Sequence, residues 1–545
     1  MDFNFTGNNL TGREKALQRF FEIVPGATSW IILIGMAILA FYKPLVAAVI
    51  IIAFYFYWLL KLWYLTIFLI LSYLRLSLED RTDWMERVRG LDRLDRYLEE
   101  LRNKPGPRDL RKRVSLFLHK KEVEGLFMSG VGRPLSKDIY HLVIIPVAKE
   151  TRDVIEPGIR SLASGMFPSK QIVVFLALEE RASEEVKEGV EGVRDDYIGR
   201  FYDMQIVTHP DGIAGEARAK GANTTYAAKK AAEYLRERNM PFENVVSSCF
   251  DSDTVVNPQY FASLTYYFQI CPERTRASFQ PVPMYNNNIW EAPGLTRVLE
   301  TGSSFFQLIE ATNPQTLVTF SSHSMSFKAL EDVDYWPVDM ISDDSAIFWK
   351  AFIHFDGGYR VVPMYTTLSM DAVVAENWWK TVVNVYKQKR RWAWGVENFP
   401  ILIRAFLRDK KIPFFIKLKV GYKLFEGHIS WATWAFLLTI VGWLPAIFAG
   451  REFSHSVFYY SAPRIAGTIF HLASFSLITS VILSLLLLPK KKIRYSFIKR
   501  VGFALQWLLV PVTMVFLSAL PALDAQTRLM RAKYMTFWVT DKSRK

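Results

Sequence analysis

An almost continuous apolar run from Ala27 to Leu74 limits the folds open to this chain. About 20 apolar residues span a bilayer core, so the run is long enough for two crossings. Lys43-Pro44 interrupts it and predicts a turn, after which a long second helix should continue towards Arg75. We therefore expect a membrane protein in which segment 1–26 and the region after residue 74 lie on one side.

Three further apolar stretches follow near the C-terminal end, at 429–449, 465–488 and 502–520. The basic run 490–500 between the last two should be cytoplasmic, since positive charge favours that side. Five crossings would place the basic tail 523–545 outside, against the same rule. Either Pro511 or Pro521 marks a re-entrant turn, or a span is miscounted. The lysine-containing apolar segment 401–428 is expected to be interfacial and to precede a membrane region at 429–522.

Composition narrows the class of protein. Half of the residues are apolar and 22% are charged, which is typical of a membrane protein with a large soluble domain. The net charge of +14 gathers beside the apolar stretches, so we expect membrane lipid and no nucleic acid as a partner. Protein partners are not predicted. The only cysteines, Cys249 and Cys271, form no disulfide framework and no zinc spacing.

Region 75–137 is densely charged, with Leu94, Leu98 and Leu101 at helical spacing among charge pairs. It predicts cytoplasmic surface helices. From 138 to 400 the pattern becomes α/β. Apolar runs predict strands at 142–147, 171–178, 204–208 and 245–249, and helices between them at 156–163, up to 190 and from Ala214 to Arg238. Strands alternating with helices imply a mostly parallel sheet.

Two carboxylates, Asp251 and Asp253, follow the strand that begins at Val245. Ligands of open α/β sheets bind outside such strand ends. Side chains two residues apart face the same way, and paired hard oxygens suit Mg²⁺ or Mn²⁺ against phosphates. An Asx-turn that closes the strand explains the same residues without a ligand.

Three other segments carry candidate chemistry, and each has a structural explanation as well. Asp343 and Asp344 precede an apolar helix and either cap it or supply a general base. The segment 388–392, Gln-Lys-Arg-Arg-Trp, can stack on a sugar and neutralise a diphosphate, or it can lie at a membrane interface. Gly215 to Asn223 contains Lys220 and opens a helix, where a phosphate can approach the backbone.

In this order, the four segments resemble the family-2 glycosyltransferases, and more closely the membrane-embedded processive cellulose and hyaluronan synthases. The resemblance covers roughly residues 139–400 and implies a GT-A-like, mostly parallel sheet with flanking helices. The match at Gln388, Arg391 and Trp392 is its most specific part.

The resemblance also implies roles for individual residues. Asp251 and Asp253 would hold the metal and the nucleotide diphosphate, and Asp344 would be the catalytic base. Trp392 would contact the acceptor sugar. The other donor-side residues would be Lys149, Glu150, Lys220, Gln388 and Arg391.

This chain departs from the family pattern in two motifs, and His323 lies between the two acid motifs. Glu179 would replace an acidic residue that often follows the second strand. The base motif reads Ser342-Asp343-Asp344 in place of Thr-Glu-Asp. His323 would meet the acceptor or serve as a structural histidine.

The function implied is inverting transfer of a sugar from a nucleotide-diphosphate donor, expected to be a UDP-sugar, to a glycan or lipid acceptor in polysaccharide synthesis. Alternatives are a transferase that loads one sugar onto polyprenyl phosphate, and a non-enzymatic membrane scaffold or transporter. We expect a bacterial cytoplasmic membrane, with the catalytic domain, 138–400, in the cytoplasm.

Overall fold

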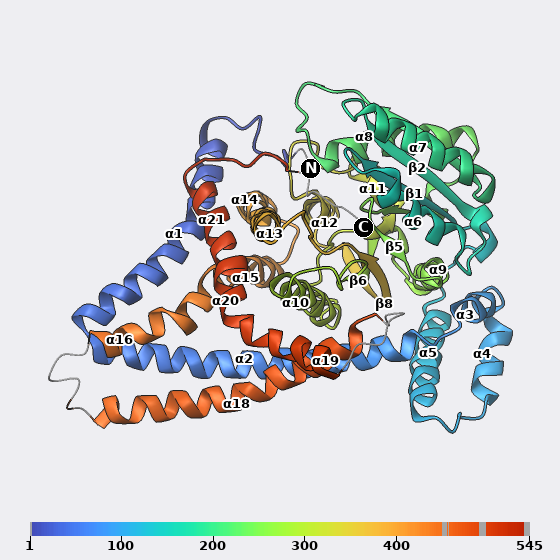
Figure 1. Cartoon of the computed structure of the whole chain (residues 1–545). Coiled ribbons are helices and arrows are strands. Elements are labelled where there is room, and N and C mark those ends of the chain that lie inside the picture. Colours follow the sequence, from blue (N-terminus) through green and yellow to red (C-terminus); the bar gives the residue numbers. More distant parts are fainter. Residues whose placement is uncertain (1–2, 449–454, 456, 490–496, 539–545) are drawn as a thin grey trace.

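The computed structural model of the chain describes residues 3–448, 455, 457–489 and 497–538. Most of the basic run 490–500 and the end of the tail lie outside these residues. Figure 1 shows long helices gathered in one half of the molecule and the sheet with its covering helices in the other.

Two long helices form the N-terminal apolar region, α1 (Gly12–Tyr42) and α2 (Pro44–Glu79). They meet at Lys43, as predicted. Pro44 occupies the first turn of α2, where its missing N–H costs no helical hydrogen bond.

Among the described residues, four helices are long and apolar enough to cross a membrane: α1, α2, Tyr459–Leu487 within α18 (Val457–Leu487), and the helical stretch Val501–Met530. A fifth candidate is α15 (Phe414–Thr439), which is followed by Val441–Ile447 after a bend of 44°. The bent segment contains the short helix α16 (Leu444–Ile447). α15 continues through residue 428, so no break separates the expected interfacial segment from the following apolar stretch.

The last apolar stretch is helical throughout its described length, with Pro511 and Pro521 inside it. It consists of α19 (Phe497–Leu505), α20 (Val510–Met514) and α21 (Leu520–Met530), joined by short 3-10 and π segments. Each proline lies in the first turn of a segment, where a helix tolerates it.

The charged region after α2 folds into three helices, α3 (Trp84–Leu91), α4 (Leu94–Asn103) and α5 (Leu110–Ser129). Leu94, Leu98 and Leu101 are buried, as their helical spacing indicates.

An eight-stranded sheet forms the centre of the other half, in the order β3-β2-β1-β4-β7-β6-β8-β5. β1 (Tyr140–Val147), β2 (Ile172–Glu179), β3 (Asp203–His209) and β4 (Val245–Cys249) pair in parallel. β6 (Ala277–Tyr285) and β8 (Arg360–Met370) also pair in parallel. The short strands β7 (Ser324–Ser326) and β5 (Val255–Val256) pair antiparallel, so the sheet is mixed.

Helices cover both faces of the sheet. Along β1, Val143 and Ile145 enter one core, while Leu142 and Ile144 enter the other. The first core is closed by α3, α4 and α5 together with α6 (Arg152–Ala163), α7 (Glu184–Tyr197) and α9 (Tyr260–Ile270). The second is closed by α8 (Lys220–Glu237), α11 (Phe327–Asp332), α12 (Asp343–His354) and α14 (Asn398–Arg408).

Two more helices, α10 (Gly294–Ala311) and α13 (Trp378–Ala393), lie between the sheet and the long helices (Figure 1). The helix expected from Ala214 begins only at Lys220. Gly215 has φ +87°, and the Ala217 N–H donates to the Val338 carbonyl, so these residues form a loop.

Candidate active site

The candidate residues near the strands gather at one edge of the sheet. β1, β2 and β4 are parallel, so their carboxyl ends share that edge. Lys149 and Glu150 follow β1, Glu179 ends β2, and the Asp251–Asp253 loop follows β4. Such an edge is where open α/β sheets bind ligands.

Lys220 joins the two acid motifs. Its ammonium Nζ lies 2.8 Å from Oδ1 of Asp251 and 2.8 Å from Oδ1 of Asp344. Burial by itself would lower the pKa of Lys220, but these two carboxylates raise it well above its usual range. Residues 251 and 344, far apart in the sequence, therefore share one buried cation.

Neighbouring polar groups hold the Asp251–Asp253 loop. The Ser321 hydroxyl donates to Oδ2 of Asp251 at 2.6 Å. The Asp371 N–H donates to Oδ2 of Asp253 at 2.9 Å, and the Asn287 amide donates to the Asp253 carbonyl at 3.0 Å. Sequence patterns gave no sign of Asn287 or Asp371, because each lies just beyond a strand end without a motif of its own.

Asp343 is buried beside the candidate base. Desolvation, reinforced by the charge of Asp344, raises the pKa of Asp343 to about 7. Gly221 allows this approach, since a Cβ there would lie 2.6 Å from the Pro337 carbonyl oxygen and 3.0 Å from Cβ of Asp343.

Glu397 connects the base motif to the end of α13. Its Oε1 accepts hydrogen bonds from the Ser342 hydroxyl at 2.6 Å and the Ser342 N–H at 3.2 Å, and its Oε2 accepts one from Trp394 Nε1 at 2.7 Å. Burial raises the pKa of Glu397 to about 7. The sequence shows this residue only as an acid beyond the Gln-Lys-Arg-Arg-Trp segment.

A buried ion pair lies beneath Trp392. Nζ of Lys389 is 2.9 Å from Oε2 of Glu300 on α10 and 3.6 Å from the centre of the Trp392 ring. The Trp392 ring also lies 5.4 Å from the Tyr285 ring, at the end of β6. A cation over an indole face stabilises the position of the ring.

Gln388 is buried and Arg391 is half-buried on the same helix. The Arg391 guanidinium lies 5.1 Å from the Phe537 ring. Its charge also acts to lower the pKa of Asp343, which indicates that α13 faces the acid cluster.

His323 lies at the back of the site, fully buried. Its Nδ1 is 2.9 Å from the Phe320 carbonyl oxygen and therefore donates to it. Burial lowers the pKa of His323, so the ring is neutral at pH 7. Its Nε2 has no hydrogen-bond partner within the described part of the chain.

Of the remaining donor-side residues, Glu179 lines a separate hollow. A cavity of about 260 Å³ is lined by Glu179, His209, Glu216 and Ala219, the neighbour of Lys220. Glu179 is ion-paired with Arg181. Glu150 accepts hydrogen bonds from the N–H groups of Ala148 and Lys149, and Lys149 is exposed.

Within the described residues, no cluster of three or more His, Cys, Asp or Glu side chains is arranged to hold a metal ion. Asp251 and Asp253 nevertheless fit a cation of the Mg²⁺ type, which takes one or two protein carboxylates and completes its shell with substrate phosphate and water.

Comparison with known proteins matches the part of the chain that contains Asp251, Asp253 and Asp344, and Lys220 lies before the matched residues. Residues 248–521, just over half of the chain, match the glycosyl transferase family group 2. A poly-beta-1,6-N-acetyl-D-glucosamine synthase of Staphylococcus aureus is 25% identical over 297 residues, which cover 53% of this chain and 61% of that protein. The synthase of Staphylococcus epidermidis is 24% identical over 322 residues, which cover 57% and 68%. The match thus spans less than two thirds of the S. aureus relative.

Two solved structures are similar at low identity. The mannosyltransferase PcManGT from Pyrobaculum calidifontis, in complex with GDP-Man and Mn²⁺, has a TM-score of 0.38 and 14% identity, covering 68% of this chain and 98% of that one. S. aureus TarS 1–349 in complex with UDP has a TM-score of 0.32 and 10% identity, covering 63% and 91%.

Proposed function

Because the chain belongs to glycosyl transferase family group 2, we propose that it moves a sugar from a UDP-sugar to a growing glycan at the membrane. The names of the staphylococcal relatives make N-acetylglucosamine the first sugar to test. The catalytic half lies in the cytoplasm, where nucleotide sugars are available.

One observation carries the proposal: the contact of Lys220 with both Asp251 and Asp344. Both carboxylates contact the same cation: Asp251, which is suited to binding the donor diphosphate, and Asp344, which is suited to accepting a proton. A donor bound at Asp251 would therefore present its anomeric carbon close to Asp344.

Transfer then needs one proton acceptor and a stabilised leaving group. The acceptor hydroxyl oxygen bonds to the anomeric carbon as the bond from that carbon to the diphosphate oxygen breaks. The hydroxyl proton passes to Asp344, and the electron pair leaves on the diphosphate. Attack opposite the leaving group inverts the anomeric centre.

Charge on the leaving diphosphate is stabilised by Lys220 and Arg391, with Gln388 beside them. Asp251 and Asp253 would hold Mg²⁺ or Mn²⁺, which supplies further positive charge at the diphosphate. The cavity at Glu179 is the proposed site of the nucleotide base, and Lys149 and Glu150, just after β1, are proposed donor contacts. Trp392 and His323 are the proposed acceptor contacts.

The test is nucleotide release by detergent-purified protein offered a panel of nucleotide sugars with Mg²⁺ or Mn²⁺. Asp344→Asn keeps the shape of the side chain and should reduce release by about 10²-fold or more, since general base catalysis contributes about 10²–10⁴-fold. Asp356→Asn is the matched control, because Asp356 is a partly exposed acid just after the same helix, paired with Lys411.

Sizing of the sugar product separates a polymer from a single sugar on a lipid. No release from any donor by folded protein in native lipid would overturn the proposal and favour a scaffold. An equal loss of nucleotide release in Asp356→Asn would contradict the proposal that Asp344 is the catalytic base.

A further inference from the structure

Helix α5 has two unlike faces. Ser115, His119 and Glu122 point towards the body of the protein, with Val123 and Leu126 buried beside them. The opposite stripe is uncovered and largely apolar. Its exposed fractions are 69% at Leu110, 39% at Val114, 54% at Phe117 and 79% at Met128. The spacing places these four residues along one side of the helix.

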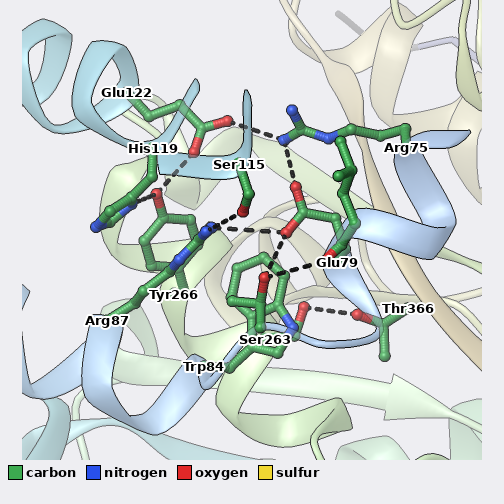
Figure 2. Close-up of polar contacts among 12 residues, drawn as sticks. Arg75, Glu79, Trp84, Arg87, Ser115, His119, Glu122, Ser263, Tyr266 and Thr366 are labelled. Carbon is green, nitrogen blue, oxygen red and sulfur yellow. Dashed lines mark hydrogen bonds and ion pairs between the residues drawn. The ribbon is translucent and has the colours of Figure 1, made fainter. Parts of the chain in front are cut away.

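The inner face of α5 is fixed to the end of α2 by a buried polar network (Figure 2). Arg75 on α2 contacts Glu79 at 2.8 Å and Glu122 on α5 at 3.3 Å. Tyr266 on α9 donates to Glu122 at 2.7 Å, and its hydroxyl lies 2.8 Å from Nδ1 of His119.

Arg87 on α3 completes this attachment. It lies 3.5 Å from Glu79 and donates to the Ser115 hydroxyl at 2.7 Å. Burial lowers the pKa of His119 to about 2, so its ring stays neutral as part of the network. The inner face is thus fully occupied, and α5 cannot rotate its apolar stripe inwards without breaking these contacts.

The end of α2 marks the edge of its apolar stretch. Between Lys61 and Arg75 the helix carries no charged residue. In Figure 1, α5 stands across this end of α2, and α4 covers the side of α5 away from it. The contact of Arg75 with Glu122 therefore places α5 directly beside the end of the apolar stretch of α2.

Basic residues accompany the apolar stripe. Segment 108–121 carries six basic side chains and one acidic side chain, Asp109; the basic residues are Arg108, Arg111, Lys112, Arg113, Lys120 and Lys121. Lys121 lies within the stripe, 4.7 Å from the Phe117 ring centre. Apolar residues bordered by Lys and Arg are the composition of helices that lie in a lipid headgroup layer.

We propose that the outer face of α5 rests on the surface of the membrane and binds anionic lipid headgroups. Leu110, Val114, Phe117 and Met128 enter the boundary of the acyl chains, and the basic side chains meet the lipid charges. The catalytic half is then held to the bilayer at a second place besides its long helices.

The chain offers a clean background for a test, because both of its cysteines are buried. Phe117→Cys carries an environment-sensitive fluorophore in the full chain, reconstituted in nanodiscs that contain brominated lipids. The matched control is Glu99→Cys, an exposed position on neighbouring α4. We expect several-fold stronger quenching at position 117 than at 99, and stronger quenching in phosphatidylglycerol than in phosphatidylcholine.

A second variant tests the charge. Arg113→Gln, Lys120→Gln and Lys121→Gln together should remove the preference for anionic lipid while the protein stays folded, since none of these residues is fully buried. If quenching at position 117 is no stronger than at position 99, the proposal is overturned. The outer face of α5 would then contact solvent or a protein partner. A label that is quenched equally in both lipids overturns the anionic part.

Discussion

Asp343 gives the candidate site a pH-dependent stability. Its pKa rises to about 7 on folding from an ordinary value of 3.8. The protonated form is therefore favoured in the folded protein, and its stabilising effect is lost as pH rises from about 4 to about 7. The full effect is on the order of 4 kcal/mol.

Asp343→Asn mimics the protonated acid without changing its size. We expect the variant to unfold at a higher temperature than the parent at pH 8 and at a similar temperature at pH 4. Thermal unfolding in detergent across this pH range measures the difference. A constant difference at all pH values would show that ionisation of Asp343 is not the cause.

The buried ion pair of Lys389 and Glu300 should couple the effects of these two residues on stability. Replacing only one of them should cost more stability than replacing both. Lys389→Met leaves a buried carboxylate without its cation and should cost about 3–5 kcal/mol of stability. Lys389→Met combined with Glu300→Leu removes both charges and should cost much less. Thermal unfolding of the two variants decides this, with the exposed Lys380→Met as control. A double variant at least as unstable as Lys389→Met alone would contradict the coupling.

At the scale of helices and strands, the start of α8 depends on Gly221. An added methyl group would meet the Pro337 carbonyl oxygen at 2.6 Å, so α8 would have to shift away from α12. We expect Gly221→Ala to lose about 1–3 kcal/mol of stability and to separate Lys220 from Asp344. Gly302→Ala, within α10 where no atom lies within 4 Å, is the control. Equal unfolding temperatures for the two variants would contradict the prediction.

Local patterns were enough to predict the elements that depend on local sequence. Apolar runs predicted β1 to β4, the Lys43-Pro44 pair predicted the break between α1 and α2, and motifs singled out both acid pairs. Long-range contacts had no such signal. Glu397 and Asp371 act on Ser342 and Asp253 from distant positions, and the antiparallel strands β5 and β7 are too short to show a period. The roles of the individual site residues remain predictions.

At the scale of the whole molecule, both described ends of the chain lie against the catalytic half. Arg404 on α14 donates to the Asn4 carbonyl at 2.8 Å, and Phe537 lies against Arg391. The last apolar stretch contacts the same half near both of its ends, through Gln506 to Arg297 at 2.8 Å and Asp524 to Arg390 at 2.8 Å. We therefore expect this stretch not to carry the basic tail to the far side.

Cysteine labelling tests this topology. Lys533→Cys should react with an impermeant maleimide from the same side of the membrane as Glu188→Cys on α7. Lys43→Cys, between α1 and α2, should react from the other side. If Lys533→Cys reacts together with Lys43→Cys, the stretch crosses the bilayer.

The unbroken course of α2 has a mechanical consequence. The helix has 36 residues and is therefore about 54 Å long, against a hydrocarbon core of about 30 Å. Its last turn is paired with α3 and α5, and α5 in turn with α9, so these contacts leave no hinge between the end of α2 and the helices that cover the sheet. A thicker or thinner bilayer would then tilt or displace the catalytic half as one rigid piece. The acyl-chain length of the surrounding lipid would then determine how far from the bilayer the candidate active site lies.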